Sequence, residues 1–152
     1  MRQITYSSKI SRDLRTELEK LLFFNPLQAR CSKGIDEVVD RYGFPRIVEY
    51  ECFLQVAIGD LPDVQCLFAL DDAPPIGNLL GVLLYYRTSA EEVIVIHIAV
   101  DKNCSAFGEF SNELVVLRMI QKLKEDLQRV RGVKKILISY NSRFDTLFRA
   151  NL

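Results

Sequence analysis

The sequence lacks most of the features that mark export, membrane insertion or charge-driven binding of nucleic acid. Its 20 basic residues balance its 20 acidic ones, so the chain has no overall field that attracts nucleic acid or an anionic membrane. The N-terminus has no apolar segment of the kind found in signal peptides. No window approaches the roughly 18 continuous apolar residues of a membrane span. We therefore expect a cytoplasmic protein that contacts neither a membrane nor nucleic acid.

Metal ligands are also scarce. The chain has one histidine and four cysteines, none of them in a CxxC pair: Cys31, Cys52, Cys66 and Cys104. A structural zinc site needs four such ligands, usually with two of them closely spaced. We expect no metal site, and we expect the cysteines to be reduced and buried.

The length and composition fit a single domain over residues 1–152. Hydrophobic residues make up 49% of the chain, which is enough for a substantial core. A first strand is predicted at 2–7. Ser11 can cap a helix that ends at Asn25-Pro26 and places four leucines on one face, namely Leu14, Leu18, Leu21 and Leu22. A second helix is predicted over 34–42, before Gly43.

The middle of the chain has the period-2 pattern of β-strands. Strict alternation over 47–58 predicts one strand with a buried face. Three further strands follow at 64–70, 79–87 and 92–100, and their short connections indicate antiparallel neighbours. The run 92–100 is apolar on both faces, so we expect a central strand that is covered on both sides.

The period then changes to that of a helix. An apolar stripe predicts a long helix, capped by Ser111 or Asn112 and ended near Gly132; its members are Val116, Ile120, Leu123, Leu127 and Val130, supported by Leu114 and Leu117. A strand at 134–140 and a last helix at 142–150 follow. Strand, helix and strand form a crossover that makes strands 92–100 and 134–140 parallel. The predicted fold is mixed α/β, with a mostly antiparallel central sheet and helices on both faces.

A loop with the sequence KNCSAFGEF, residues 102–110, leads from the central strand into the long helix. This arrangement resembles the GNAT superfamily of acyl-CoA-dependent transferases, whose motif Arg/Gln-x-x-Gly-x-Gly/Ala occupies the same place. In the best register Ser105 lies at the Arg/Gln position, Gly108 matches the first glycine, and Phe110 replaces the last small residue. Glu109 adds a negative charge to the loop. The order of the other elements is also similar to that family, most closely over residues 64–152.

The resemblance implies that acetyl-CoA or another acyl-CoA binds at this loop. Backbone N–H groups at a helix N-terminus would hold the pyrophosphate. Asn141 matches a family asparagine after the fifth strand, while Phe148 stands where the family often has a tyrosine that protonates the leaving thiolate. The cofactor-binding residues implied are Val100, Phe107, Gly108, Glu109, Phe110, Ser111, Asn112 and Asn141.

The activity implied is transfer of an acyl group to the amine of a small molecule or a protein. His97 or Glu92 is the candidate base, and Tyr140, at the end of a parallel strand, is the candidate acid. Each also has a structural interpretation. His97 fits a core histidine, Glu91 and Glu92 fit solvated turn residues, and Tyr85, Tyr86 and Tyr140 fit amphipathic packing. Cys104 fits an ordinary cysteine as well as a nucleophile.

Two other functions are compatible with the same residues. A non-catalytic GNAT-like module would keep the fold and bind a ligand or a protein. Without the two strands that usually end the family fold, a sheet edge would stay open and allow a homodimer. A small regulatory α/β domain unrelated to the family is the third alternative.

Overall fold

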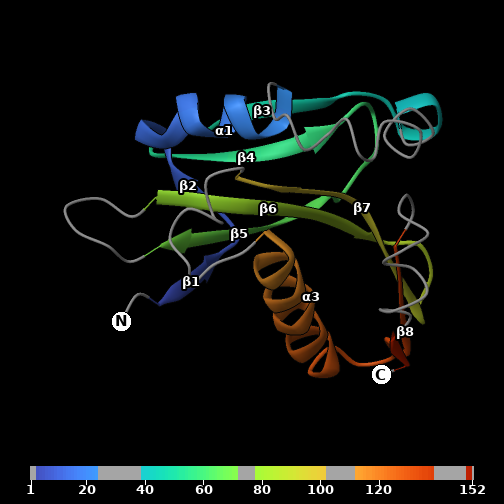
Figure 1. Cartoon of the computed structure of the whole chain (residues 1–152). Coiled ribbons are helices and arrows are strands. Elements are labelled where there is room, and N and C mark those ends of the chain that lie inside the picture. Colours follow the sequence, from blue (N-terminus) through green and yellow to red (C-terminus); the bar gives the residue numbers. More distant parts are fainter. Residues whose placement is uncertain (1–2, 24–38, 72–77, 102–111, 139–149, 152) are drawn as a thin grey trace.

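The computed structural model describes residues 3–23, 39–71, 78–101, 112–138 and 150–151 (Figure 1). These residues form two β-sheets. A six-stranded sheet has the order β1-β5-β6-β7-β8-β9, and a three-stranded sheet has the order β2-β4-β3. The large sheet consists of β1 (Ile4–Ser7), β5 (Gln65–Asp71), β6 (Asn78–Arg87), β7 (Glu92–Val100), β8 (Lys135–Ile138) and β9 (Ala150–Asn151). The small sheet consists of β2 (Ile10–Ser11), β3 (Pro45–Glu49) and β4 (Phe53–Ile58).

The fold is therefore mixed α/β with a mostly antiparallel sheet. Strands β5, β6 and β7 form the antiparallel meander that the sequence predicts. Strand β7 lies between β6 and β8, which confirms its central position. The pair β7 and β8 is parallel, and the helix α3 (Asn112–Gln128) lies between these two strands in the sequence.

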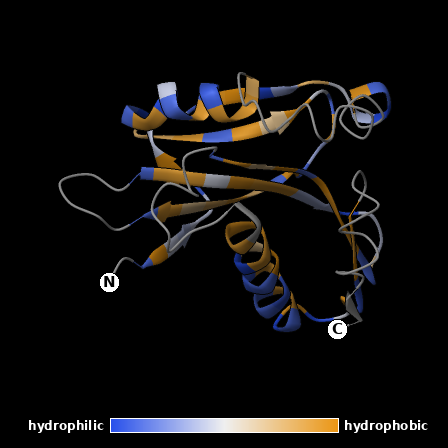
Figure 2. Cartoon of the chain, viewed as in Figure 1, coloured by the Kyte–Doolittle hydropathy of each residue, from blue (hydrophilic) through white to orange (hydrophobic). Residues whose placement is uncertain are grey.

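The large sheet is covered on both faces. Helix α3 packs on one face and builds the core that we call the α3-side core. Helix α1 (Arg15–Phe23) and the small sheet pack on the other face and build the α1-side core. Figure 1 shows α3 on one side of the large sheet and α1 with β3 and β4 on the other. In Figure 2 the strands β6 and β7 are largely hydrophobic, whereas both helices mix hydrophobic and hydrophilic residues. That is the pattern of a sheet between two covering layers.

The N-terminal helix agrees with its sequence signals. Ser11 caps a short 3-10 turn, Arg12–Leu14, and its Oγ accepts a hydrogen bond from the backbone N–H of Asp13 at 3.2 Å. Helix α1 continues from this turn, and Leu14, Leu18, Leu21 and Leu22 are all buried. In the region of the second predicted helix, residues 39–42 are helical and 34–38 lie outside the described residues.

The single strand predicted over 47–58 is wrong. The segment is a hairpin in which β3 and β4 pair antiparallel, with Glu49 opposite Leu54. The chain reverses at Glu51 and Cys52, where the backbone N–H of Tyr50 donates to the carbonyl of Phe53 at 2.8 Å. Short hairpin turns usually contain Gly, Asn or Asp, and this turn has none of these residues. The alternating pattern runs through the turn without a break, so it predicted one longer strand.

Two residues of the predicted α3 stripe face solvent. Leu117 and Val130 are each 41% exposed, and Val130 follows the end of the helix. The buried stripe consists of Val115, Val116, Met119, Ile120, Leu123 and Leu127. Gly132 ends the region with φ +93°, a conformation that favours glycine.

The C-terminal prediction is partly wrong. Ala150 and Asn151 form β9 and pair antiparallel with β8, whereas the sequence predicted that Ala150 ends a helix. The rest of that predicted helix lies outside the described residues. The sequence predicted an open sheet edge at this end of the fold. Strand β9 pairs with β8 and extends the sheet by one strand, so β8 is not the edge strand. Local helical spacing cannot anticipate such pairing, because the partner strand is distant in the sequence.

The cysteines also differ from expectation in one respect. Among the described residues, Cys66 is buried and Cys52 is exposed, and neither is in a disulfide. Cys52 lies in the hairpin turn, where its side chain has no core to enter. The buried thiol of Cys66 accepts from the backbone N–H of Val56 at 3.2 Å and donates to its carbonyl at 3.3 Å. It therefore joins the large sheet to the small one.

Candidate functional site

The candidate site lies along β7, whose path is changed by a β-bulge. Leu84 of β6 is opposite His97, but the next residue, Tyr85, is opposite Val95. Ile96 is thus an extra residue on β7. A bulge of this kind bends the strand and re-aims the side chains that follow. The described ladder between β7 and β8 runs from Glu92–Lys135 to Val95–Ile138, so it ends beside the bulge.

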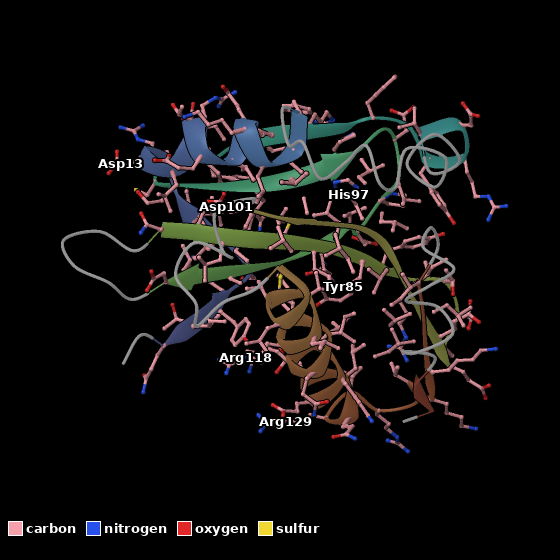
Figure 3. All side chains as sticks on the ribbon, viewed as in Figure 1. Asp13, Tyr85, His97, Asp101, Arg118 and Arg129 are labelled. Carbon is pink, nitrogen blue, oxygen red and sulfur yellow. The ribbon has the colours of Figure 1, made fainter. Side chains whose placement is uncertain are left out.

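His97 lies on the α1 side of the sheet. Its opposite residue, Leu84, belongs to the α1-side core, and Figure 3 shows the His97 label on the side of β7 that faces α1. The side chain is only 4% exposed. Burial lowers the pKa of His97 to about 4, because the charged imidazolium would lose its hydration. The imidazole is therefore neutral at pH 7 and is a weak base. This environment agrees with the core-histidine interpretation.

Glu92 is engaged in two polar contacts. Its Oε1 accepts from the hydroxyl of Thr88 at 2.9 Å, and its Oε2 pairs with Nζ of Lys135 at 3.1 Å. Hydrogen bonds from Lys135 and then from Thr88 are the main causes that lower the pKa of Glu92. The carboxylate is thus held in its charged form and links the start of β7 to β8. A base that accepts a proton from an ammonium group benefits from the opposite shift.

The two adjacent tyrosines of β6 belong to opposite faces and cannot serve one site together. Tyr85 packs against the α3-side core, and burial followed by the charge of Asp126 raises its pKa. Tyr86 lies with Tyr42, their ring centroids 5.7 Å apart in an edge-on arrangement. Burial and then a hydrogen bond with Tyr42 raise the pKa of Tyr86 to about 12. Both phenols stay protonated at neutral pH.

Among the predicted cofactor residues, the structure describes the end of β7 and the start of α3. Val100 is buried in the α3-side core and lies opposite Gly81 of β6. A Cβ at Gly81 would lie 2.9 Å from Sδ of Met119 and 3.0 Å from the carbonyl oxygen of Ala99. Strand β6 at Gly81 therefore approaches Met119 in the second turn of α3 closely, and this approach leaves no room for a side chain at position 81.

Tyr140 and Asn141 lie outside the described residues, as do Cys104 and the loop residues Phe107, Gly108, Glu109, Phe110 and Ser111. Asn112 is the first residue of α3. The roles of these residues remain predictions from the sequence.

The sequence interpretation missed a group of polar contacts around Arg87. This residue ends β6, and its guanidinium donates to the carbonyls of Ser89, Ala90 and Arg131. The only sequence signal was an arginine beside a short turn. That signal is weak, because Arg131 is 44 residues away in the chain.

The described residues contain no group of three or more His, Cys, Asp or Glu side chains that could hold a metal ion. None of their helices is both long enough and apolar enough to cross a membrane.

Comparisons with family models, with curated proteins and with solved structures found no match to this chain.

Proposed function

We propose that this domain is GNAT-like and that it transfers an acyl group from acetyl-CoA or another acyl-CoA to an amine. The supporting observation is the arrangement around β7: an antiparallel meander ends in a bulged strand, a long helix follows, and a parallel strand pairs with the first half of β7. Ligands in α/β sheets commonly bind beyond the carboxyl ends of parallel strands. The carboxyl ends of β7 and β8 and the start of α3 are thus the expected place for the thioester and the pyrophosphate.

The proposed chemistry is direct attack. The neutral amine adds to the thioester carbonyl, the C–N bond forms, and the C–S bond breaks as the amine loses a proton and the thiolate gains one. Tyr140 is the proposed acid for the thiolate, since a phenol can donate this proton. Backbone N–H groups of residues 107–112 are proposed to hold the pyrophosphate.

His97 and Glu92 do not carry the proton in this proposal. A buried imidazole with a pKa of about 4 is a weak acceptor, and the carboxylate of Glu92 is engaged by Lys135 and Thr88. A water molecule or bulk solvent must then accept the proton of the amine. The substrate class remains a small-molecule or protein amine.

A non-catalytic binding module is the second candidate, and specific observations favour it. The two described base candidates, His97 and Glu92, have structural roles. Of the three defining positions of the cofactor motif, only one is matched, by Gly108. Such a module would bind CoA or a partner without turnover.

A titration with acetyl-CoA, free CoA and longer acyl-CoAs, followed by unfolding temperature, tests both candidates. A ligand that binds only the folded state stabilises it by about 2.7 kcal/mol at a hundredfold excess over its dissociation constant. Gly108→Val should abolish the shift, and Gly34→Val, at a glycine outside the predicted loop, is the control.

Mass spectrometry with a panel of amines then separates the candidates. A shift together with acylated amine supports the transferase. A shift without product supports the binding module. No shift at millimolar acyl-CoA contradicts every form of the proposal that uses CoA.

A further inference from the structure

Arg87 holds together two loops that are far apart in the sequence. Its Nε donates to the carbonyl of Ser89 at 3.2 Å, and its Nη2 donates to the carbonyls of Ala90 and Arg131, the latter at 3.1 Å. The first two acceptors lie in the turn between β6 and β7. The third lies in the connection between α3 and β8. One guanidinium therefore binds both loops.

The same two loops are joined by the backbone. The carbonyl of Glu91 accepts from the N–H of Lys134 at 2.7 Å and from the N–H of Lys135 at 3.1 Å. A Cβ at Gly132 would lie 3.3 Å from both the Ala90 carbonyl oxygen and the Arg87 Nη2. The loops are packed so closely that the guanidinium fills the space between them. We call Arg87, residues 88–91 and residues 131–135 the Arg87 joint.

Two ion pairs extend the joint to the strands. Lys134 pairs with Glu91 at 3.2 Å, and Lys135 pairs with Glu92 at 3.1 Å. The side chains of the first pair are mostly exposed, so solvent weakens their attraction. The directional contacts of Arg87 and of the Glu91 carbonyl, rather than these charges, must define the relative position of the loops.

The joint lies where β7 and β8 both begin. Within the described residues their parallel ladder runs from Glu92–Lys135 to Val95–Ile138, and its first pair, Glu92 with Lys135, belongs to the joint. Because this pair is the first of the ladder, a shift of β8 at the joint would carry along the strand towards its carboxyl end, near which the acyl-CoA site is proposed.

We infer that Arg87 is a positioning residue: it sets the placement of β8 against β7 and, through it, the geometry of the acyl-CoA site. This role rests on the proposed function, but the placement of β8 by Arg87 does not. Lysine cannot replace the arginine, because a single ammonium group cannot present the planar fork of donors that reaches acceptors in both loops.

Hydrogen exchange measures the joint without any ligand. In Arg87→Gln and in Arg87→Lys, the amides of Lys134 and Lys135 should exchange about tenfold faster than in the natural chain. The amides of β5 should keep their rates. Arg46→Gln, at an exposed arginine of β3, is the matched control and should leave all of these rates unchanged. Unchanged exchange at Lys134 and Lys135 in both Arg87 variants would overturn the role of Arg87 in placing β8.

Acetyl-CoA titration measures the link to the proposed site. We expect Arg87→Gln and Arg87→Lys to raise the dissociation constant for acetyl-CoA about tenfold, since a displaced β8 misaligns contacts with the ligand. Cys66→Ala, whose substitution lies away from the joint, controls for lost stability: at a similar unfolding temperature it should retain the affinity.

The two measurements fail in distinguishable ways. Faster exchange with unchanged affinity overturns the link to the site but keeps the joint. An equal loss of affinity in Cys66→Ala reduces Arg87 to a stabilising residue and also overturns the link. If the natural chain does not bind acetyl-CoA, the proposed function and the link both fail, and the exchange result still decides whether Arg87 places β8.

Discussion

The two faces of the large sheet are packed in different ways. The α3-side core is formed by one long helix, and at Gly81 the sheet approaches Met119 of this helix without room for a side chain. The α1-side core is formed by a shorter helix and a small sheet together, and it encloses the thiol of Cys66. His97 is buried on the same side.

The difference follows from what covers each face. A single helix presents a continuous apolar stripe, so it can approach the sheet closely wherever a side chain is missing. A cover made of two elements has to be joined to the sheet as well as packed on it. Cys66 does this by bonding both backbone groups of Val56 in β4. The α1 side should therefore respond to changes in polar groups, and the α3 side to changes in volume.

The largest change in the free energy of unfolding should come from acidification, through His97 on the α1 side of the sheet. The pKa of His97 is lowered from 6.5 to about 4 in the folded state, so the unfolded chain binds the extra proton first as the pH falls. Stability is complete above pH 6.5 and is lost as the pH falls towards 4. The whole shift corresponds to about 3 kcal/mol, which is lost in full only below about pH 4, where the histidine is protonated in both states.

Urea unfolding of the natural chain and of His97→Gln between pH 7 and pH 4.5 checks this expectation. His97 is the only histidine, so the variant removes the whole histidine contribution to the slope of stability against pH. Equal slopes for the two proteins would show that His97 titrates normally in the folded state.

A larger side chain at position 81 should disrupt the packing of the α3-side core. Gly81→Val places methyl groups against Met119 and the Ala99 carbonyl, which we expect to lower the free energy of unfolding by about 2 kcal/mol. Ala57→Val, on a partly exposed position of β4, is the control and should change stability little. Thermal and urea unfolding measure both. If Met119→Ala restores none of the loss in a double variant, the helix contact is not its cause.

Removal of the Cys66 thiol should weaken the joining of the two sheets. Cys66→Ala deletes both bonds to Val56 and leaves a small void, which together cost about 1.5 kcal/mol. Cys52→Ala is the matched control, because Cys52 is exposed and should contribute almost nothing. Urea unfolding decides between them, and equal stabilities of the two variants would contradict a joining role for Cys66.

Removal of a surface ion pair should lower the free energy of unfolding least, and by a similar amount on the α1 side and on the α3 side. Lys122 pairs with Asp126 on α3 at 3.0 Å, and Arg15 pairs with Glu19 on α1 at 3.1 Å. Both pairs have the i,i+4 spacing and are substantially exposed, so Asp126→Asn and Glu19→Gln should each cost about 0.3 kcal/mol. Unfolding at low and at high salt measures the cost. A loss above about 1 kcal/mol in either variant would indicate a buried role that the geometry does not contain.

Elements with strong local signals were predictable. Ser11 and the leucines after it define the first helix, and the apolar run of β7 predicts a strand covered on both faces. The same local reasoning failed at Glu51 and Cys52, where a turn forms without turn residues, and at Ala150, where a distant strand decides the conformation. Of the candidate site, the sequence predicted that β7 is covered on both faces and allowed a core interpretation of His97, but it did not predict the contacts of Glu92 with Thr88 and Lys135.

The sequence by itself determined the chemical types of residue and the period of each segment, because cap, turn and stripe signals act over only a few positions. Only the tertiary structure decided that His97 is buried and neutral, that Glu92 is bound by Lys135, and that Arg87 joins two loops. Each of these properties depends on groups brought together from distant segments. Dielectric environment and hydrogen-bond geometry exist only once the sheets have packed.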